Sequence, residues 1–271
     1  MTSSPRPVAL VTGASAGIGK ELARVLARDH DLILTARRLD ELNTLAAELT
    51  AAHGATCRVI GADLADPTGA RALFYAVSAT GWAVEVLVNN AGFGDLNPFA
   101  KADLGKLLRM IQVNVTTLTE LIGLFLPGMQ ARGRGQILNV GSVAGFQPGP
   151  IMGTYYATKA YVNSLSQSMA NELAGSGITV TCLCPGPTDS EFAAVAGMQP
   201  TKTFSVGHRM TARAVAEQGV LGMKRGKVLV VPGARNKLMI FLQRFAPRST
   251  VIRVVRWMQE KRLGDTSKFK V

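Results

Sequence analysis

Short runs of apolar residues recur along the chain, and each is bounded by glycine, proline or polar residues. The runs lie at residues 7–11, 31–35, 56–61, 84–88, 136–140, 178–183 and 227–231. Continuous apolar runs of this length are typical of strands that are buried on both faces. The hydrophobic pattern therefore predicts about seven buried strands.

Between these runs, apolar residues recur every three or four positions, as they do in amphipathic helices. Such patterns cover residues 39–53, 101–129 and 211–223, and another extends from Tyr155 to about Ala174. Strands that alternate with helices in this way are typical of parallel βαβ units. We therefore expect an α/β fold: a single doubly wound Rossmann-type domain with a parallel sheet of about seven strands flanked by helices.

Two of the predicted helices carry a more specific expectation. In the helix that contains Tyr155, four residues spaced by four are assigned to the core face. They are Tyr161, Leu165, Met169 and Leu173. In the helix at residues 101–129, Asn114 is mildly unfavourable because its side chain competes for backbone hydrogen bonds. We expect Asn114 to bend that helix or to hold a water molecule there.

The regular pattern weakens after about residue 187 and ends near residue 233. Residues 187–210 lack a clear period, as expected of a loop that contacts a substrate. We therefore divide the chain into a main domain, residues 1–233, and a helical extension, residues 234–271. One apolar arc of the extension contains Val251, Ile252, Val254, Val255 and Met258, and Arg253 and Arg256 lie opposite.

Positive charge is concentrated in the C-terminal quarter of the chain. The formal net charge is +12, and residues 201–271 contain 16 lysines or arginines against three acidic residues. No aromatic stacking platform accompanies this charge, so nucleic acid binding is not expected. The basic amphipathic extension predicts contact with a membrane surface, with the protein's own substrate site or with a second subunit.

The cysteines and the N-terminus bear on the cellular compartment. Cys57, Cys182 and Cys184 are odd in number and lie in apolar runs, so no disulfide framework is implied. Only three histidines accompany the Cys-x-Cys spacing, and no metal site is expected. Residues 1–7 contain no apolar signal segment, and no run reaches the roughly 18 apolar residues of a membrane-spanning helix. We expect a cytoplasmic protein, associated at most with the inner face of a membrane through its extension.

A glycine-rich turn joins the first predicted strand to the following helix. It reads Thr12-Gly13-Ala14-Ser15-Ala16-Gly17-Ile18-Gly19. Glycines let the backbone approach a pyrophosphate closely, and a helix N-terminus offers free N–H groups and the positive end of its dipole. This context favours a dinucleotide site over a purely structural turn.

The second predicted strand ends at Arg37 and Arg38. In dinucleotide-binding folds this position carries an acid that binds the ribose 2′-hydroxyl, or an arginine that accommodates a 2′-phosphate. No acid is present at residues 36–38, and guanidinium groups match phosphate geometry, so NADPH is favoured over NADH. The alternative is that both arginines are solvated loop charges.

Tyr155 and Lys159 are four residues apart, so they lie on one face of the predicted helix. An adjacent ammonium lowers the pKa of a phenol by favouring the phenolate, which makes this pair suitable for general acid and base catalysis. Ser142 follows the apolar run at residues 136–140 and can present its hydroxyl to the same space. Tyr156 also shares a face with Lys159, and we expect it to serve packing.

Taken together, these motifs resemble those of the short-chain dehydrogenase/reductase family over about residues 7–233. The matching motifs are the glycine-rich turn, Asp63, Asn89-Asn90-Ala91-Gly92, Asn114, Ser142, Tyr155-x-x-x-Lys159 and Pro185-Gly186. The resemblance implies that Tyr155 protonates a substrate carbonyl oxygen as hydride arrives from a nicotinamide. It also implies that Ser142 binds that oxygen, that Lys159 holds the nicotinamide ribose and lowers the phenol pKa, and that Asn114 places a water molecule linking Lys159 to solvent.

The resemblance further implies a set of cofactor-binding residues. Asp63 would contact the adenine, and the segment after Pro185 would cover the nicotinamide carboxamide. The full set is Gly13, Ser15, Gly17, Ile18, Gly19, Arg37, Arg38, Asp63, Leu64, Asn90, Ala91, Gly92, Tyr155, Lys159, Pro185, Gly186 and Thr188. Ala16 stands where some NADP-preferring members carry a basic residue, so phosphate recognition would depend mostly on Arg37 and Arg38.

We therefore expect an NADP(H)-dependent oxidoreductase that reduces a ketone or oxidises a secondary alcohol and assembles as a homodimer or homotetramer. The apolar residues of the loop and the extension favour a lipophilic substrate, such as an acyl-chain or steroid-like ketone. The alternative is a catalytically silent regulatory or membrane-peripheral scaffold protein that binds NADP(H). Intact Asn114, Ser142, Tyr155 and Lys159 argue against this alternative.

Overall fold

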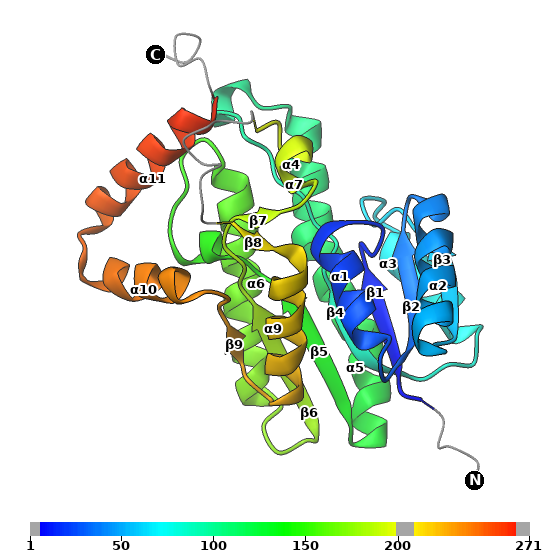
Figure 1. Ribbon diagram of the computed structural model, residues 1–271. Helices are drawn as coiled ribbons and strands as arrows, with labels where there is room; N and C mark the ends of the chain where they lie inside the picture. Colours follow the sequence, from blue (N-terminus) through cyan, green and yellow to red (C-terminus); the bar gives the residue numbers. More distant parts are fainter. Residues whose placement is uncertain (1–5, 199–208, 264–271) are drawn as a thin grey trace.

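The computed structural model describes residues 6–198 and 209–263, and its centre is a seven-stranded parallel sheet (Figure 1). The strand order is β3-β2-β1-β4-β5-β6-β9. The strands are β1 (Val8–Thr12), β2 (Asp31–Ala36), β3 (Cys57–Gly61), β4 (Val84–Asn89), β5 (Gly135–Val140), β6 (Ile178–Leu183) and β9 (Leu229–Val230). The seven predicted strands and their parallel arrangement are confirmed. The order reverses between β1 and β4, which is where doubly wound sheets bind their ligands.

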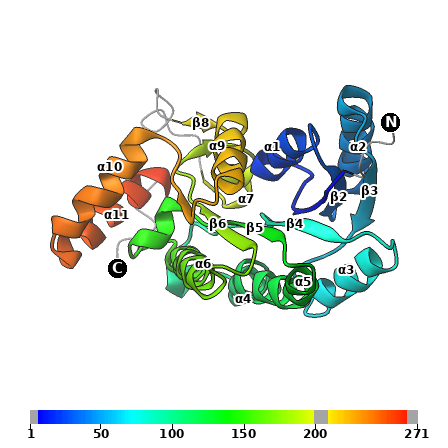
Figure 2. The same cartoon turned by 90° about the horizontal axis from the view of Figure 1, so that it is seen from below.

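Helices cover both faces of the sheet (Figure 2). One layer contains α1 (Gly17–Leu26), α2 (Leu39–His53) and α9 (Ala212–Lys224). The other contains α3 (Gly69–Ser78), α4 (Leu104–Ile111), α5 (Leu118–Arg132) and α6 (Gly153–Glu172). Each layer has its own apolar core against the sheet, because side chains of a buried strand alternate between the two faces.

The segment that contains α4 and α5 is one continuous helix interrupted by a π-helical turn, η2 (Gln112–Thr117). Among the described residues, this stretch, Leu104–Arg132, is the one helix long and apolar enough to cross a membrane. The sequence prediction is based on uninterrupted apolar runs, and no run of that length is present. The helix meets the second criterion, which is its length together with its average hydropathy. Leu118, Leu121 and Phe125 are buried in the core beneath the sheet, as in the core helix of a compact domain.

The face of α6 that packs against the sheet differs in part from the predicted one. Met169 and Leu173 are buried as expected, but the Tyr161 side chain is 38% exposed. The buried face instead includes Lys159, Val162 and Asn163. Polar side chains thus occupy inward positions that the apolar pattern could not assign to the core.

Short elements surround the carboxyl ends of the strands. They are η1 (Phe99–Lys101), η3 (Val143–Phe146), β7 (Thr188–Asp189), α7 (Phe192–Val195) and β8 (Met210–Thr211). The predicted substrate loop at residues 187–210 therefore includes β7 and α7, and its residues 199–208 lie outside the described residues.

The extension forms α10 (Ala234–Leu242), η4 (Gln243–Phe245) and α11 (Arg248–Leu263), and α11 returns toward the domain above α6 (Figure 1). It begins after Gly233, whose φ of 84° lies in the left-handed region that favours glycine. The predicted apolar arc of α11 is only partly correct. Val255 is 4% exposed, but Val254 is 50% exposed. The packed face also contains the polar Gln259, which is 2% exposed.

Candidate active site

The hydroxyl of Thr12 connects the ends of the two central strands. It donates a hydrogen bond to the carbonyl of Val88 at 3.1 Å and accepts from the backbone N–H groups of Asn90 and Ala91 at 3.0 Å each. The side-chain amide of Asn90 in turn donates to the carbonyls of Thr12 and Gly13, at 2.9 and 3.2 Å. These bonds hold the glycine-rich turn against the turn that follows β4. Thr12 was not among the predicted site residues.

Close packing explains the glycines of this turn. Gly13 has a φ of 66°, and a Cβ there would lie 2.9 Å from Nδ2 of Asn90. A Cβ on Gly19 would lie 2.3 Å from the same nitrogen and from the carbonyl oxygen of Gly13. Gly17 also has a positive φ, and α1 begins there without a side-chain cap. The turn and the free N–H groups of the first turn of α1 therefore form a cradle suited to a phosphate group. Ser15 and Ile18 are half-buried in the same segment.

The two arginines at the end of β2 have different surroundings. Arg38 donates to the hydroxyl of Ser15 at 3.2 and 3.3 Å and forms ion pairs with Glu191 at 3.0 Å and with Glu41 at 3.6 Å. Arg37 is exposed and forms no ion pair with any described residue. The Arg37 guanidinium is thus open to an anion beside the glycine-rich turn.

The predicted adenine contacts lie at the end of β3. Asp63 is exposed and accepts a hydrogen bond from the N–H of Ala65 at 3.0 Å, whereas Leu64 is buried. The carboxylate thus faces solvent while its neighbour packs in the core. Beside the central strand, a Cβ on Gly92 would lie 2.9 Å from Oδ1 of Asn114, so this position also requires a small residue.

Asn114 lies in the π-helical turn and is 1% exposed. Its side chain donates to the carbonyl of Phe93 and to Thr158 Oγ1, both at 3.0 Å, and accepts from the N–H of Phe93 at 3.1 Å. π-Helical turns within α-helices are frequent at functional sites. The expected disturbance of this helix at Asn114 is present, and the side chain connects the loop after β4 to α6.

Ser142 and Tyr155, the predicted proton-donating residues, lie after β5 and near the start of α6. Ser142 is buried after β5, and its hydroxyl accepts from the N–H of Ala144 at 3.0 Å. Burial raises the pKa of Tyr155, and a hydrogen bond with Ser142 acts in the opposite direction. The expectation that Lys159 makes the phenol more acidic is therefore not what this structure shows, because desolvation of the phenolate is the larger effect.

Lys159 is 6% exposed, and its ammonium donates to the carbonyl of Val140 at 2.7 Å. The Nζ atom lies 5.9 Å from the centroid of the Tyr155 ring. Burial lowers the pKa of Lys159 to about 8, since the charged form is desolvated, while the nearby Cys182 and Cys184 act in the opposite direction. The ammonium therefore loses its proton more readily than that of a solvent-exposed lysine.

Asn163, one helical turn after Lys159, was not predicted as a site residue. Its amide donates to the carbonyl of Ser142 at 3.0 Å and accepts from the Ser142 N–H at 3.3 Å. A Cβ on Gly141 would lie 2.1 Å from Asn163 Oδ1, and one on Gly145 would lie 2.4 Å from Nδ2. Asn163 therefore fixes the backbone of Ser142, and its four-residue step from Lys159 is the sequence signal that could have identified it.

The expected buried thiols lie directly beneath this asparagine. The Sγ atoms of Cys182 and Cys184 are 3.5 Å apart, and they lie 3.5 and 3.3 Å from Oδ1 of Asn163. All three cysteines are free thiols. Within residues 6–198 and 209–263, no group of three His, Cys, Asp or Glu side chains is placed to hold a metal ion.

An apolar cluster packs against Tyr155, and we call it the Tyr155 cluster. Its buried members are Leu96, Ala144, Met152, Tyr156 and Val255. The ring of Phe192 in α7 lies 5.2 Å from the ring of Tyr155. Tyr156 serves packing as expected, and its hydroxyl accepts a hydrogen bond from Gln259 of α11 at 2.7 Å. The extension therefore contributes directly to the surroundings of the candidate catalytic tyrosine.

The segment after β6 connects Ser142 with the extension. The carbonyl of Pro185 accepts from the N–H of Val143 at 3.0 Å, and the Thr188 hydroxyl donates to the carbonyl of Gly186 at 2.9 Å. A Cβ on Gly186 would lie 2.5 Å from the side chain of Asn236 in α10. The predicted residues Pro185, Gly186 and Thr188 thus lie at the carboxyl end of the sheet beside the other site residues.

The fold and these residues define a dinucleotide-binding oxidoreductase architecture, and residues 7–200 match the family model described as short chain dehydrogenase. The chain belongs to the short-chain dehydrogenase/reductase family. The solved structure of a short-chain dehydrogenase from Sphingobium yanoikuyae in complex with NADPH is 33% identical, with a TM-score of 0.79. That match covers 88% of this chain and 94% of the other.

Two relatives indicate the range of similar proteins. A very-long-chain 3-oxoacyl-CoA reductase of Aspergillus clavatus is 38% identical over 177 residues, which are 64% of this chain and 51% of that protein. The chain thus spans about half the length of this fungal reductase. The ketoacyl reductase HetN of a Nostoc species is 28% identical over 266 residues, 95% of this chain and 91% of that protein.

Proposed function

We propose that the protein catalyses the NADPH-dependent reduction of a ketone on a lipophilic substrate, or the reverse oxidation of a secondary alcohol. The observation that carries this proposal is the convergence of Ser142, Tyr155, Lys159 and Asn114 beside the glycine-rich cradle. NADPH, when bound, supplies the hydride that is added to the carbonyl carbon. The catalytic domain would be residues 1–233, with residues 234–271 as an extension that contributes to the substrate side.

The chain's own residues account for the proton. Because burial raises the pKa of Tyr155, the phenol is protonated at neutral pH and can donate its proton to the carbonyl oxygen. Ser142, whose hydroxyl donates to the carbonyl of Pro185 at 3.4 Å, would donate instead to the same substrate oxygen and stabilise its developing charge. Lys159, with a pKa of about 8, would return a proton toward Tyr155 after the transfer. Asn114 would hold the path from Lys159 to solvent.

The arginines at the end of β2 support a preference for NADPH. Arg37 has no ion-pair partner among the described residues, and it stands where dinucleotide folds recognise the 2′ position of the adenosine ribose. Arg38 donates hydrogen bonds to Ser15 and would stabilise the conformation of the glycine-rich turn that contacts the phosphates. Asp63, which is exposed at the end of β3, would contact the adenine edge.

A lipophilic substrate is supported by the Tyr155 cluster. Leu96, Met152 and Val255 present alkyl groups beside the phenol, and Phe192 adds an aromatic ring. The cluster offers dispersion contacts and hydrophobic burial to an acyl chain and few groups that could bind a sugar. The names of the similar ketoacyl and 3-oxoacyl reductases agree with an acyl-chain ketone.

A turnover experiment tests this function. The wild type, Tyr155→Phe and the matched control Tyr161→Phe would be titrated with NADPH and NADH and then assayed with a panel of acyl-chain and steroid-like ketones. Tyr161 is an exposed phenol on the same helix. We expect all three proteins to bind NADPH, and only Tyr155→Phe to lose turnover, by at least about 100-fold. Retained turnover in Tyr155→Phe would contradict the assignment, and a wild type that binds NADPH but reduces no ketone of the panel would favour the silent binding protein.

We also propose that the protein is cytoplasmic and that the outer side of α10 and η4 contacts an anionic membrane. Leu238, Phe241, Leu242 and Phe245 are all more than half exposed there. Arg235, Lys237 and Arg244 are exposed in the same segment and form no ion pair with a described residue. Basic residues beside exposed apolar groups are typical of interfacial helices.

Vesicle binding tests this membrane contact. We expect the wild type to sediment with vesicles that contain an anionic lipid and Phe241→Ser/Phe245→Ser to remain in solution. Equal sedimentation of both proteins would refute the proposed surface. Assembly as a homodimer or homotetramer remains part of the proposal, and sedimentation velocity measures it.

A further inference from the structure

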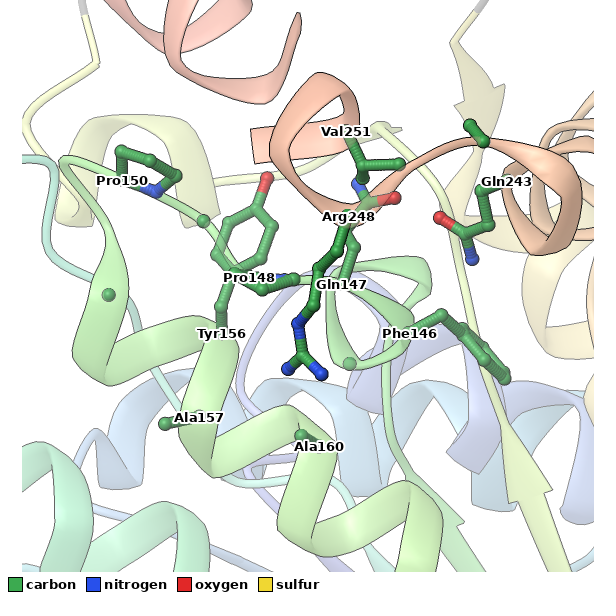
Figure 3. Close-up of a pocket in the computed structure, with 14 residues that line it drawn as sticks. Phe146, Gln147, Pro148, Pro150, Tyr156, Ala157, Ala160, Gln243, Arg248 and Val251 are labelled. Atoms are coloured by element: carbon green, nitrogen blue, oxygen red, sulfur yellow. The ribbon is translucent and has the colours of Figure 1, made fainter. Parts of the chain in front are cut away.

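A pocket of about 600 Å³ lies between the extension and the N-terminal half of α6 (Figure 3). One wall is the loop after η3 and the outer side of α6, and the other is the segment from Gln243 to Val251. Tyr156 separates this pocket from Tyr155: its ring lines the pocket, while it also packs in the Tyr155 cluster and binds Gln259. Neither Ser142 nor Tyr155 lines it. The pocket is therefore a second space, distinct from the candidate active site.

The walls of the pocket are mostly apolar. Phe146 lines it from the end of η3, Pro148 and Pro150 from the following loop, and Val251 from α11. On α6 the pocket is lined by Tyr156 and by three small residues, Gly153, Ala157 and Ala160. A volume of this size is within the range of small-molecule sites, which are typically apolar with a few polar groups that orient the ligand.

Two polar side chains from the extension face this apolar space. Figure 3 shows the side chain of Arg248 extending from the start of α11 toward α6, with its guanidinium on the side of Ala157 and Ala160. In the described part of the chain Arg248 forms no ion pair, whereas Arg256 two turns later pairs with Glu260 at 2.8 Å. The Oε1 atom of Gln243 is buried and has no hydrogen-bond partner.

Arg248 is solvent-exposed and has no described ion-pair partner, so its guanidinium is available to an anionic group at the pocket. The buried Oε1 atom of Gln243 lacks a hydrogen-bond donor, which is costly for a buried acceptor and marks this part of the pocket as able to accept a polar group.

We propose that this pocket binds a single-chain anionic amphiphile, with a carboxylate or phosphate head group on Arg248 and an alkyl chain along Phe146, Pro148 and Val251. The charge complementarity comes from Arg248, and the apolar lining residues suit an alkyl chain. Such a ligand contacts α6 on one side and the extension on the other. Its binding therefore holds α11 in place beside the Tyr155 cluster, and the inference does not depend on the proposed reaction.

Binding of decanoate to the full-length protein, measured by isothermal titration calorimetry, tests the inference. Decanol has the same chain without the charge, and decyl phosphate carries the other head group. We expect wild type to bind decanoate at least tenfold more tightly than decanol, since charge-assisted hydrogen bonds are the stronger ones. Whichever of decanoate and decyl phosphate binds more tightly identifies the preferred head group. Equal affinity for decanoate and decanol would overturn the proposal.

Variants locate the site. Arg248→Gln is expected to lose at least about tenfold in decanoate affinity, whereas Arg253→Gln, an exposed arginine on the same helix, keeps it. Ala160→Phe fills the pocket and is expected to weaken decanoate and decanol alike. Unchanged decanoate affinity in Arg248→Gln would show that the head group binds elsewhere and would overturn the proposal. A chain that ends at Leu263 and binds decanoate at least tenfold more tightly than the full chain would show that the C-terminal residues are the natural occupant, and this too would overturn the proposal.

Discussion

Removal of the Asn163 side chain is the sharpest test of how the candidate active site is built. In Asn163→Ala the buried N–H of Ser142 loses its partner, which lies at 3.3 Å in the wild type. The carbonyl of Ser142 loses the bond from Asn163 at 3.0 Å but keeps the bond from the N–H of Gly145 at 3.1 Å. An unsatisfied buried N–H costs about 1–3 kcal/mol and a lost hydrogen bond about 1 kcal/mol, so the free energy of unfolding should fall by about 3 kcal/mol. For a domain of this size that corresponds to a decrease in Tm of roughly 6–12 °C.

The same change should also lower activity, because Ser142 is no longer fixed relative to Tyr155. A displacement of about 1 Å at a reacting group can cost about 100-fold in rate, so we expect kcat to fall by about 10- to 100-fold with a smaller change in KM. The assay is NADPH oxidation with the best ketone of the panel, at a temperature well below the Tm of each variant. Thermal unfolding is followed by circular dichroism on the same preparations.

Two further variants separate positioning from stability. Gln167→Ala removes an exposed side chain that donates to the Asn163 carbonyl at 2.7 Å and does not reach Ser142, so it should lose little in kcat. Asn163→Asp keeps an acceptor for the Ser142 N–H but loses the donor to its carbonyl, and we expect an intermediate kcat. If Asn163→Ala lowers Tm while kcat is unchanged, the residue is only structural. If neither value changes, the hydrogen bonds to Ser142 are not important.

Three other predictions follow from the site and the extension. Arg37→Ser should weaken NADPH binding by at least about tenfold and leave NADH binding unchanged, whereas the distant Arg71→Ser should affect neither; fluorescence titration measures both. Burial lowers the pKa of Lys159 to about 8 from 10.5, so the folded protein loses this proton before the unfolded chain does. The stability contributed by this group therefore rises between about pH 8 and 10.5. The free energy of unfolding of Lys159→Met, measured by chemical denaturation, should rise less over that interval than that of wild type. Gln259→Leu removes the bond to Tyr156 and should lower the free energy of unfolding by about 1–2 kcal/mol and speed proteolysis of the extension; cleavage at the wild-type rate would contradict this role.

The fold was accessible from the sequence because its strands are buried on both faces. Such strands appear as uninterrupted apolar runs, and the glycine-rich turn marks the point where the first of them meets a helix. The predicted helix at residues 39–53 agrees with α2 at both ends. The buried positions of α6 were harder to predict, because its inward face contains Lys159 and Asn163, which an apolar pattern does not assign to the core.

The electrostatics of the site could not be obtained from spacing alone. The four-residue step places Tyr155 and Lys159 on one helix face, but burial, which is a tertiary property, determines the direction in which their pKa values move. The burial of individual residues in the extension likewise could not be predicted from their spacing. Five apolar residues of α11 share an arc, yet only the contact with the Tyr155 cluster determines that Val255 is buried while Val254 is half exposed.

The path of the extension also bears on how the protein can be handled in the laboratory. A purification tag or surface linker at the C-terminus follows residues 264–271, which come directly after α11 in the chain. Helix α11 packs beside Tyr155 through Val255 and Gln259. A tag before Val8 enters at the amino end of β1, whereas the candidate site lies at the carboxyl ends of the strands. Immobilisation through the N-terminus should therefore leave access to the candidate site intact, whereas a C-terminal fusion acts on the helix that packs beside Tyr155.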